Sequence, residues 1–161
     1  MQKTNVMRIL DKAKISYTII EYEVDESDLS GVHIAECTGM DPERVFKTLV
    51  AKGDKTGFVV FCIPCHKEVD LKQAARVTGN KKVEFLHLKD LLPTTGYIRG
   101  GCSPIGMKKK FPTFIDETAL GHDKISVSGG MRGLQVILSP EELADFTEAK
   151  FFNLTGEKNE Q

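Results

Sequence analysis

The chain has 161 residues, of which 40% are hydrophobic and 28% are charged, and its formal net charge is −1. This length predicts one domain with a sizeable core, and the near-neutral charge excludes strong nucleic-acid binding by the overall field. No apolar run approaches the ~20 residues of a membrane span and no signal-peptide core follows the N-terminus, so we expect a cytoplasmic protein without a membrane partner.

Helices and strands alternate in the first half of the chain. The predicted order is helix 5–13, strand 17–24, helix 32–37, a helical turn at 41–42, strand 48–51 and strand 57–63. Thr4 precedes the first helix as a capping residue, and Gly39 follows the second as a helix terminator. The polar run 52–56 separates two apolar strands, so these strands are predicted to form a hairpin.

The second half contains more strands than helices. The predicted order is helix 70–76, strand 82–86, helix 88–92, strands 97–99, 112–116, 124–127 and 134–138, and a helix that starts at Ser139. Hairpins mixed with crossovers predict an α+β fold with a curved mixed β-sheet flanked by helices. Residues 1–161 are expected to form a single domain, with a polar tail at 155–161.

The pair Cys62 and Cys65, with the intervening Ile-Pro, admits several interpretations. Cys-x-x-Cys before a helix is typical of a thiol redox site, and with His66 the string also matches a haem attachment motif. A zinc site would lack a second closely spaced ligand pair. Cys62 lies inside an apolar strand, and the next helix begins only at about Asp70, which favours structural thiols.

Three polar or glycine-rich segments could form a binding site. The loop 99–106 contains three glycines and a proline, so its backbone N–H groups could face an anion, and lysines 108–110 follow it. A second glycine-rich strand end lies at 126–130, and Lys47 stands beside an apolar strand. Each feature also has an ordinary interpretation as a turn, a solvated tail or a lysine that extends to solvent.

Taken together, these segments resemble the YbaK/prolyl-tRNA-synthetase-associated domain family. The similarity is carried by residues 41–50, by 100–109, by Ser-Val-Ser-Gly-Gly at 126–130 and by Arg-Gly-Leu-Gln at 132–135. It extends over about residues 4–152. The resemblance implies a curved sheet that is nearly a barrel, which agrees with the order of the predicted elements.

The resemblance also implies an activity. Members of this family are trans-editing deacylases that cleave the ester between a wrong amino acid and tRNA, and the closest branch removes cysteine from tRNA(Pro). The implied catalytic residues are Lys47, Gly101 and Ser128. The implied substrate-binding residues are Tyr22, Thr48, Gly100, Cys102, Ser103, Pro104 and Gly129. No metal or cofactor is implied, and the expected partners are aminoacylated tRNA(Pro), bound weakly, and prolyl-tRNA synthetase.

In the cysteine-specific branch the thiol of the substrate attacks its own carbonyl, which would explain why the sequence lacks a nucleophile signature. Thr48 favours cysteine, because the alanine-specific branch has asparagine at that position. His33 departs from the small residue expected there. Editing of alanine or serine, a non-catalytic tRNA- or synthetase-binding module, and a thiol oxidoreductase therefore remain as alternatives.

Overall fold

The computed structural model describes residues 2–156, so positions 157–161 of the expected polar tail lie outside the described residues. Residues 2–156 form five helices, α1 (Asn5–Lys12), α2 (Gly31–Thr38), α3 (Leu71–Thr78), α4 (Leu88–Thr95) and α5 (Pro140–Thr147). Short 3-10 turns lie at Pro42–Arg44 and Glu117–Gly121. None of the helices in the described part is long and apolar enough to cross a membrane.

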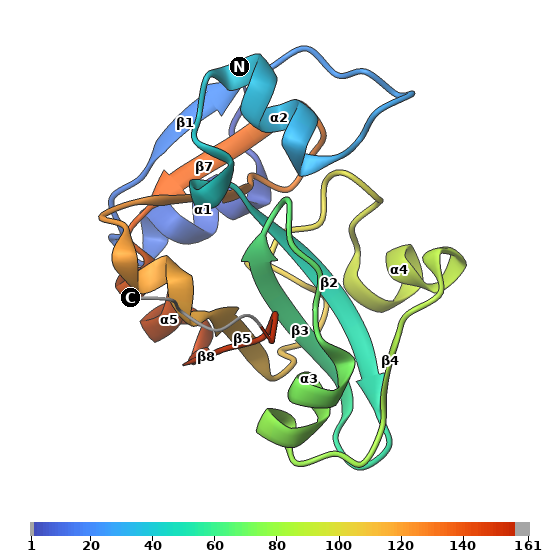
Figure 1. Cartoon of the computed structure of the whole chain (residues 1–161). Coiled ribbons are helices and arrows are strands. Elements are labelled where there is room, and N and C mark those ends of the chain that lie inside the picture. The colour runs from blue at the N-terminus through green and yellow to red at the C-terminus, as the bar shows by residue number, and fades with distance from the viewer. Residues whose placement is uncertain (1, 157–161) are drawn as a thin grey trace.

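Eight strands complete the fold, and the helices flank them (Figure 1). The strands are β1 (Thr18–Glu21), β2 (Phe46–Gly53), β3 (Gly57–Pro64), β4 (Val83–Phe85), β5 (Thr113–Asp116), β6 (Ile125–Ser128), β7 (Leu134–Leu138) and β8 (Lys150–Phe152). The predicted α+β class, with mixed strand pairing, is confirmed.

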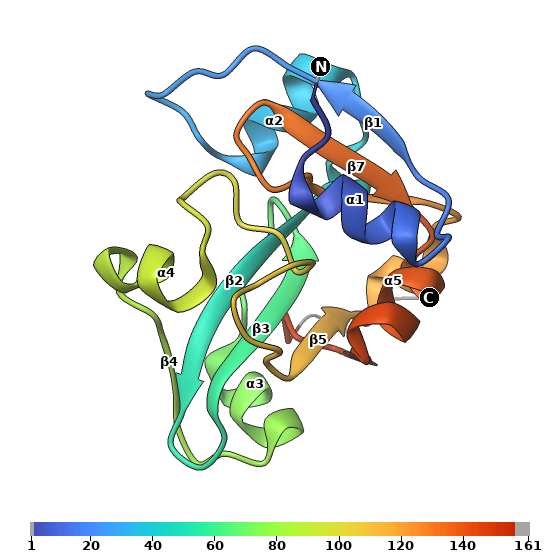
Figure 2. The same ribbon diagram turned by 180° about the vertical axis from the view of Figure 1, so that it is seen from behind.

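The strands divide between two sheets. One sheet has the order β4-β2-β3-β5-β8, with antiparallel pairing around β2 and parallel pairing of β5 with β3 and β8. The other has the order β1-β7-β6 and is antiparallel. A single parallel bridge between Val45 and Ser126 joins the two sheets, which then diverge without closing into a barrel. Figure 2 shows the two sheets from behind.

Capping side chains fix the ends of three helices as predicted. Thr4 Oγ accepts from the Met7 amide at α1, and the Asp70 carboxylate accepts from the Lys72 and Gln73 amides at α3. Ser139 Oγ accepts from the Glu142 amide at α5. Such caps satisfy N–H groups that have no partner within the helix, so each element begins where its capping residue stands.

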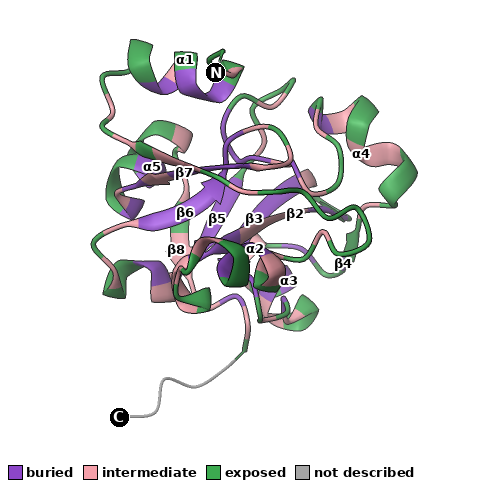
Figure 3. Ribbon diagram, turned by 90° about the horizontal axis from the view of Figure 1, so that it is seen from above, coloured by how far each residue is buried: buried purple, intermediate pink, exposed green. Residues whose placement is uncertain are grey.

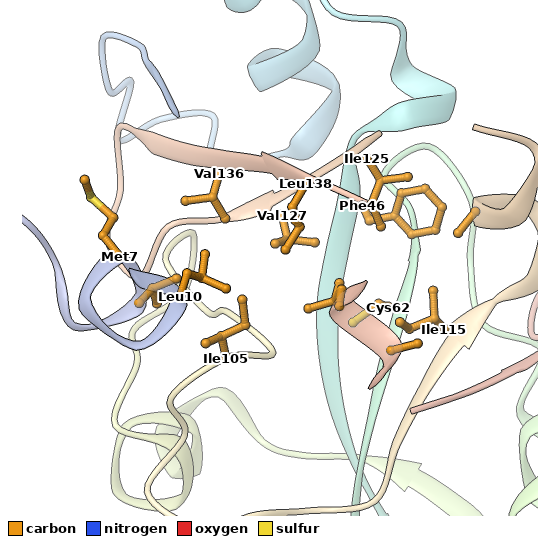
Figure 4. Close-up of a cluster of buried hydrophobic side chains, with 14 of the residues drawn as sticks. Met7, Leu10, Phe46, Cys62, Ile105, Ile115, Ile125, Val127, Val136 and Leu138 are labelled. Atoms are coloured by element: carbon orange, nitrogen blue, oxygen red, sulfur yellow. The ribbon is translucent and has the colours of Figure 1, made fainter. Parts of the chain in front are cut away.

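The largest core cluster fills the space between α1, the β6–β7 hairpin and the β3–β5 region. Figure 4 shows Val127 and Val136 from the hairpin directed toward Met7 and Leu10 of α1, with Ile105 alongside. Figure 3 shows the same core by burial, with β5 and β6 buried and the outer faces of the helices exposed. One face of the hairpin is thus apolar core, which leaves its opposite face for other contacts.

One predicted strand and the end of one predicted helix in the second half are wrong. Residues 97–99 form no strand, because Gly96 reverses the chain in a left-handed conformation and the Tyr97 amide donates to Thr95 Oγ. Helix α4 continues beyond residue 92 and contains Pro93, which has no N–H to donate. Pro93 lies in the last turn, so the helix loses only one hydrogen bond near its end. Strand β8 was not predicted, because three residues carry no recognisable periodicity and its partner β5 is remote in sequence.

Candidate functional site

A cavity of about 380 Å³ lies where the two sheets diverge. Its wall is formed by the start of α2, the edge of β2, the β4–α4 connection, the loop at residues 99–102 and the ends of β6 and β7. The Val45–Ser126 bridge lies at the point where the sheets separate, so the backbone pairing that joins the sheets also positions the cavity.

Strand β2 presents an open edge to this cavity. The Leu86 amide donates to the Val50 carbonyl at 3.0 Å on one side, and the Cys65 amide donates to the Val45 carbonyl at 2.8 Å on the other. Because backbone groups alternate in direction along a strand, the N–H and C=O of Thr48 point to the same side as those of Val50. Strand β4 pairs only with Ala51–Gly53, so within the described residues no strand covers this edge at Thr48.

The wall opposite β2 is polar although it is buried. Ser126, Ser128 and Gln135 are 0%, 7% and 2% exposed, and they share the face of the β6–β7 hairpin that lies away from the apolar core. Ser128 and Gln135 line the cavity. Ser126 Oγ donates to Gln135 Oε1, and Ser128 Oγ accepts from the Gly130 amide, so the acceptor atoms of this face are already paired. The donors that remain on Ser128 and Gln135 make the face a candidate for contact with a polar ligand.

The glycine loop is folded tightly against the β6–β7 turn. A Cβ at Gly101 would lie 3.2 Å from backbone atoms of Met131 and Arg132, and Arg132 Nε donates to the Arg99 carbonyl at 2.8 Å. The Gly101 amide donates to the Ile98 carbonyl, so this N–H is already engaged in a turn. An added side chain at position 101 would therefore force the two backbones apart by a few tenths of an ångström.

The rest of the loop is held by internal hydrogen bonds. The Ile105 amide donates to Ser103 Oγ, and the Tyr97 hydroxyl donates to the Ile105 carbonyl. Burial raises the pKa of Tyr97 to about 12, so this hydroxyl remains a donor at neutral pH. Ser103 and Pro104 are buried and thus support the loop from behind.

Lys47 lies at the rim of the cavity. Alternation along β2 directs its side chain to the face opposite that of Thr48, and its ammonium group is 3.6 Å from the Glu68 carboxylate. The Glu68 side chain is 85% exposed and that of Lys47 is 25% exposed. An ion pair with so exposed a partner is worth at most about 1 kcal/mol, which leaves the ammonium group available to another anion.

The structure brings together half of the residues that the resemblance implied. Lys47, Thr48, Gly100, Cys102 and Ser128 line the cavity. The others lie behind its wall, namely Tyr22, Gly101, Ser103, Pro104 and Gly129.

Two of these outer residues show how the wall is supported. Tyr22 packs against the buried cluster beneath α2. The Gly129 amide and carbonyl are engaged by the Leu134 carbonyl and the Thr4 hydroxyl. Tyr22 and Gly129 therefore support the cavity wall indirectly, because they hold α2 and the β6–β7 turn in place.

Sequence reasoning missed several cavity residues. Leu88 and Leu91 of α4, Phe85 at the end of β4 and Arg99 in the glycine loop contribute to the wall. Gln135 carried the clearest signal, since it is the polar residue within the apolar strand Leu134–Leu138. Leu88 is 59% exposed and also lines the cavity, which its pattern alone could not predict.

The cysteines are free and differ in their surroundings. Cys62 is fully buried in the core, and burial raises its pKa to about 12. Cys65 is buried in another cluster, and burial raises its pKa as well. A redox pair needs an accessible thiolate, so these surroundings favour structural thiols. Within residues 2–156, no group of three His, Cys, Asp or Glu side chains is arranged to hold a metal ion.

Cys102 is expected to act as part of the cavity wall and not as a nucleophile. Burial raises its pKa to about 12, so the thiolate forms only as the pH rises toward that value. We expect Cys102→Ser to slow single-turnover deacylation by less than about tenfold. Alkylation of Cys102 by iodoacetamide should be slow at neutral pH and accelerate at alkaline pH. Complete loss of activity in a folded Cys102→Ser variant would contradict this interpretation.

Comparison with known proteins agrees with this geometry. A family model described as the aminoacyl-tRNA editing domain matches residues 32–146. The chain is 52% identical over 154 residues to EbsC of Enterococcus faecalis, named as a candidate Cys-tRNA(Pro)/Cys-tRNA(Cys) deacylase, and the match covers 96% of this chain and 94% of EbsC. The chain therefore belongs to the aminoacyl-tRNA editing domain family, and the resemblance seen in the sequence is confirmed.

More distant relatives extend the comparison. The chain is 25% identical to the uncharacterized protein YwhH of Bacillus subtilis, over 81% of this chain and 84% of YwhH. A crystal structure described as a candidate trans-editing enzyme for prolyl-tRNA synthetase superposes with a TM-score of 0.81 at 22% identity, covering 98% of this chain and all of that one. At this identity the superposition supports the fold.

Proposed function

We propose that the chain acts as a single editing domain that removes mischarged cysteine from tRNA(Pro). The observation that carries the proposal is the cavity between the two sheets. It combines a buried polar wall with a basic rim, and the one cysteine in its wall is held in the thiol form. Such a site can bind and polarise an ester but offers no thiolate of its own. The name of EbsC, 52% identical, supports cysteine and tRNA(Pro) as the substrate.

The reaction that suits this site uses the nucleophile of the substrate. The cysteinyl thiol adds to its own ester carbonyl, the carbon–oxygen bond to the terminal ribose breaks, and the thiol proton passes to the departing ribose oxygen. The products are a cyclic thiolactone and free tRNA. Holding the thiol and the carbonyl in reacting geometry supplies much of the acceleration, because both groups already belong to one molecule.

The rim of the cavity suits the nucleotide end of the substrate. Lys47 offers an ammonium group there, and Leu29, Ser30 and Gly31 bring the start of α2 to the same cavity. Partial positive charge at a helix N-terminus and the lysine would together favour a phosphate. We assign Lys47 to the terminal phosphate or ribose region, Thr48 and Gly100 to the cavity wall, and Ser128 to the ester.

The near-neutral net charge predicts weak binding of free tRNA. We therefore propose that prolyl-tRNA synthetase delivers the substrate, since a bridging partner raises the effective concentration without new contacts to tRNA. Addition of the synthetase should lower the concentration of editing protein needed for half-maximal deacylation. If the synthetase leaves this concentration unchanged, delivery of the substrate by prolyl-tRNA synthetase is contradicted.

The function is tested with tRNA(Pro) charged in turn with cysteine, alanine or serine. We expect wild-type protein to release cysteine well above the spontaneous rate and to act much more slowly on the other two esters. Equal rates on all three would favour a general small-residue editor. A rate on cysteine no higher than the spontaneous rate would favour a non-catalytic binding module.

A further inference from the structure

Two side chains of the polar wall line the cavity and have hydrogen-bond donors for which the described residues supply no partner. Gln135 Oε1 accepts from Ser126 Oγ at 2.8 Å, which anchors one end of the amide and leaves its NH₂ group toward the cavity. Within residues 2–156, Ser126 is the only hydrogen-bond partner of the Gln135 side chain. Ser128 Oγ accepts from the Gly130 amide at 3.1 Å, so its own proton is free to be donated elsewhere.

The hairpin register brings these two donors close together. Ser128 and Gln135 are directly opposite each other on β6 and β7. The neighbouring Gly129 amide donates to the Leu134 carbonyl, so Gly129 and Leu134 are a hydrogen-bonded pair of the ladder. Because such pairs alternate with non-hydrogen-bonded pairs in antiparallel strands, Ser128 and Gln135 are a non-hydrogen-bonded pair. In such pairs the Cα atoms are about 4.5 Å apart and the side chains are at their closest.

We propose that the Gln135 amide and the Ser128 hydroxyl form a two-donor cradle for the carbonyl oxygen of the aminoacyl ester, with Gln135 as a catalytic residue. This assignment rests on the proposed function. When the substrate thiol adds to the carbonyl carbon, the electron pair of the carbon–oxygen double bond moves onto that oxygen. The two donors stabilise the negative charge until the ester bond breaks and the carbonyl re-forms.

Burial makes the cradle effective. Gln135 is 2% exposed and Ser128 is 7% exposed, so little water competes for the oxygen. Fixed donors in such an environment need no reorganisation during the reaction. Ser126 acts as a positioning residue, because its hydrogen bond fixes which end of the Gln135 amide meets the substrate.

Two replacements of Gln135 separate this role from a structural one. Gln135→Glu has nearly the same shape and can still accept from Ser126, but an ionised carboxylate has no proton to donate. Gln135→Met keeps the volume and introduces no buried charge, so it decides the question if the glutamate variant fails to fold. Gln73→Met on α3 is the matched control, since it makes the same chemical change outside the cavity.

The measurement is single-turnover release of cysteine from tRNA(Pro), with melting temperatures recorded for every variant. We expect the single-turnover rate constant at saturating protein to fall about a hundredfold in both Gln135 variants, with little change in the protein concentration that gives half of this rate, and Gln73→Met to match the wild type. Ser126→Ala should give a smaller loss of the rate constant. Wild-type activity in a folded Gln135→Met variant, which has no donor at this position, would overturn the cradle and leave the proposed function intact. Absence of catalysis by the wild type would overturn both.

Discussion

Replacing Lys47 by alanine is expected to slow release of cysteine from tRNA(Pro) about a hundredfold, the magnitude typical of losing one group that stabilises developing or bound charge. The ammonium group stands at the cavity rim, and its ion-pair partner Glu68 is largely exposed. A phosphate could therefore replace Glu68 at little cost. The measurement is kcat/KM for deacylation at fixed ionic strength.

Lys52→Ala is the matched control for this experiment. Lys52 lies on the same strand, is exposed and contacts the Phe58 ring, but it does not line the cavity. We expect it to retain the wild-type rate and a similar melting temperature. Near wild-type deacylation by Lys47→Ala would remove this lysine from the site, and equal losses in both variants would indicate a general effect of charge.

Replacing Gly101 by valine is expected to have the second large effect. Its Cβ would lie 3.2 Å from the Met131 and Arg132 backbones, which cannot move without displacing the β6–β7 turn. The branched side chain would force the glycine loop away from the polar wall. Overpacking of this kind costs about 1–3 kcal/mol of unfolding free energy, measured by urea denaturation, and deacylation should fall at least about tenfold.

Gly121→Ala tests whether this loss is specific to position 101. A Cβ at Gly121 meets no atom within 4 Å, so the substitution should leave both stability and activity close to wild type. If Gly101→Val were fully active, the close approach of the two backbones would have no part in shaping the site.

Local signals in the sequence were sufficient for much of the fold. The caps at Thr4, Asp70 and Ser139 act within a few residues, and the hairpin of β2 and β3 joins strands that are adjacent in the chain. These features depend on short-range chemistry that a single sequence displays directly. The same sequence could not place β8, whose pairing with β5 arises only after the chain has folded.

The site was predictable in part. Lys47 and Ser128 were implied by family resemblance, and both line the cavity. Gln135 is visible in the sequence as a polar residue within an apolar strand, but its importance depends on its hydrogen bond with Ser126, which only the folded hairpin shows. The loop at residues 99–106 is expected from the sequence to present backbone N–H groups to a ligand, whereas in the structure the N–H of Gly101 donates to the Ile98 carbonyl.

In the proposed reaction the protein positions and polarises an ester whose own thiol carries out the attack. The most direct test compares wild-type deacylation of tRNA(Pro) charged with cysteine and with S-methylcysteine, which has the same ester but no thiol proton. We expect rapid release of cysteine and a rate for S-methylcysteine close to the spontaneous one. Equally rapid release of both amino acids would contradict it and would require water or a protein group as the nucleophile.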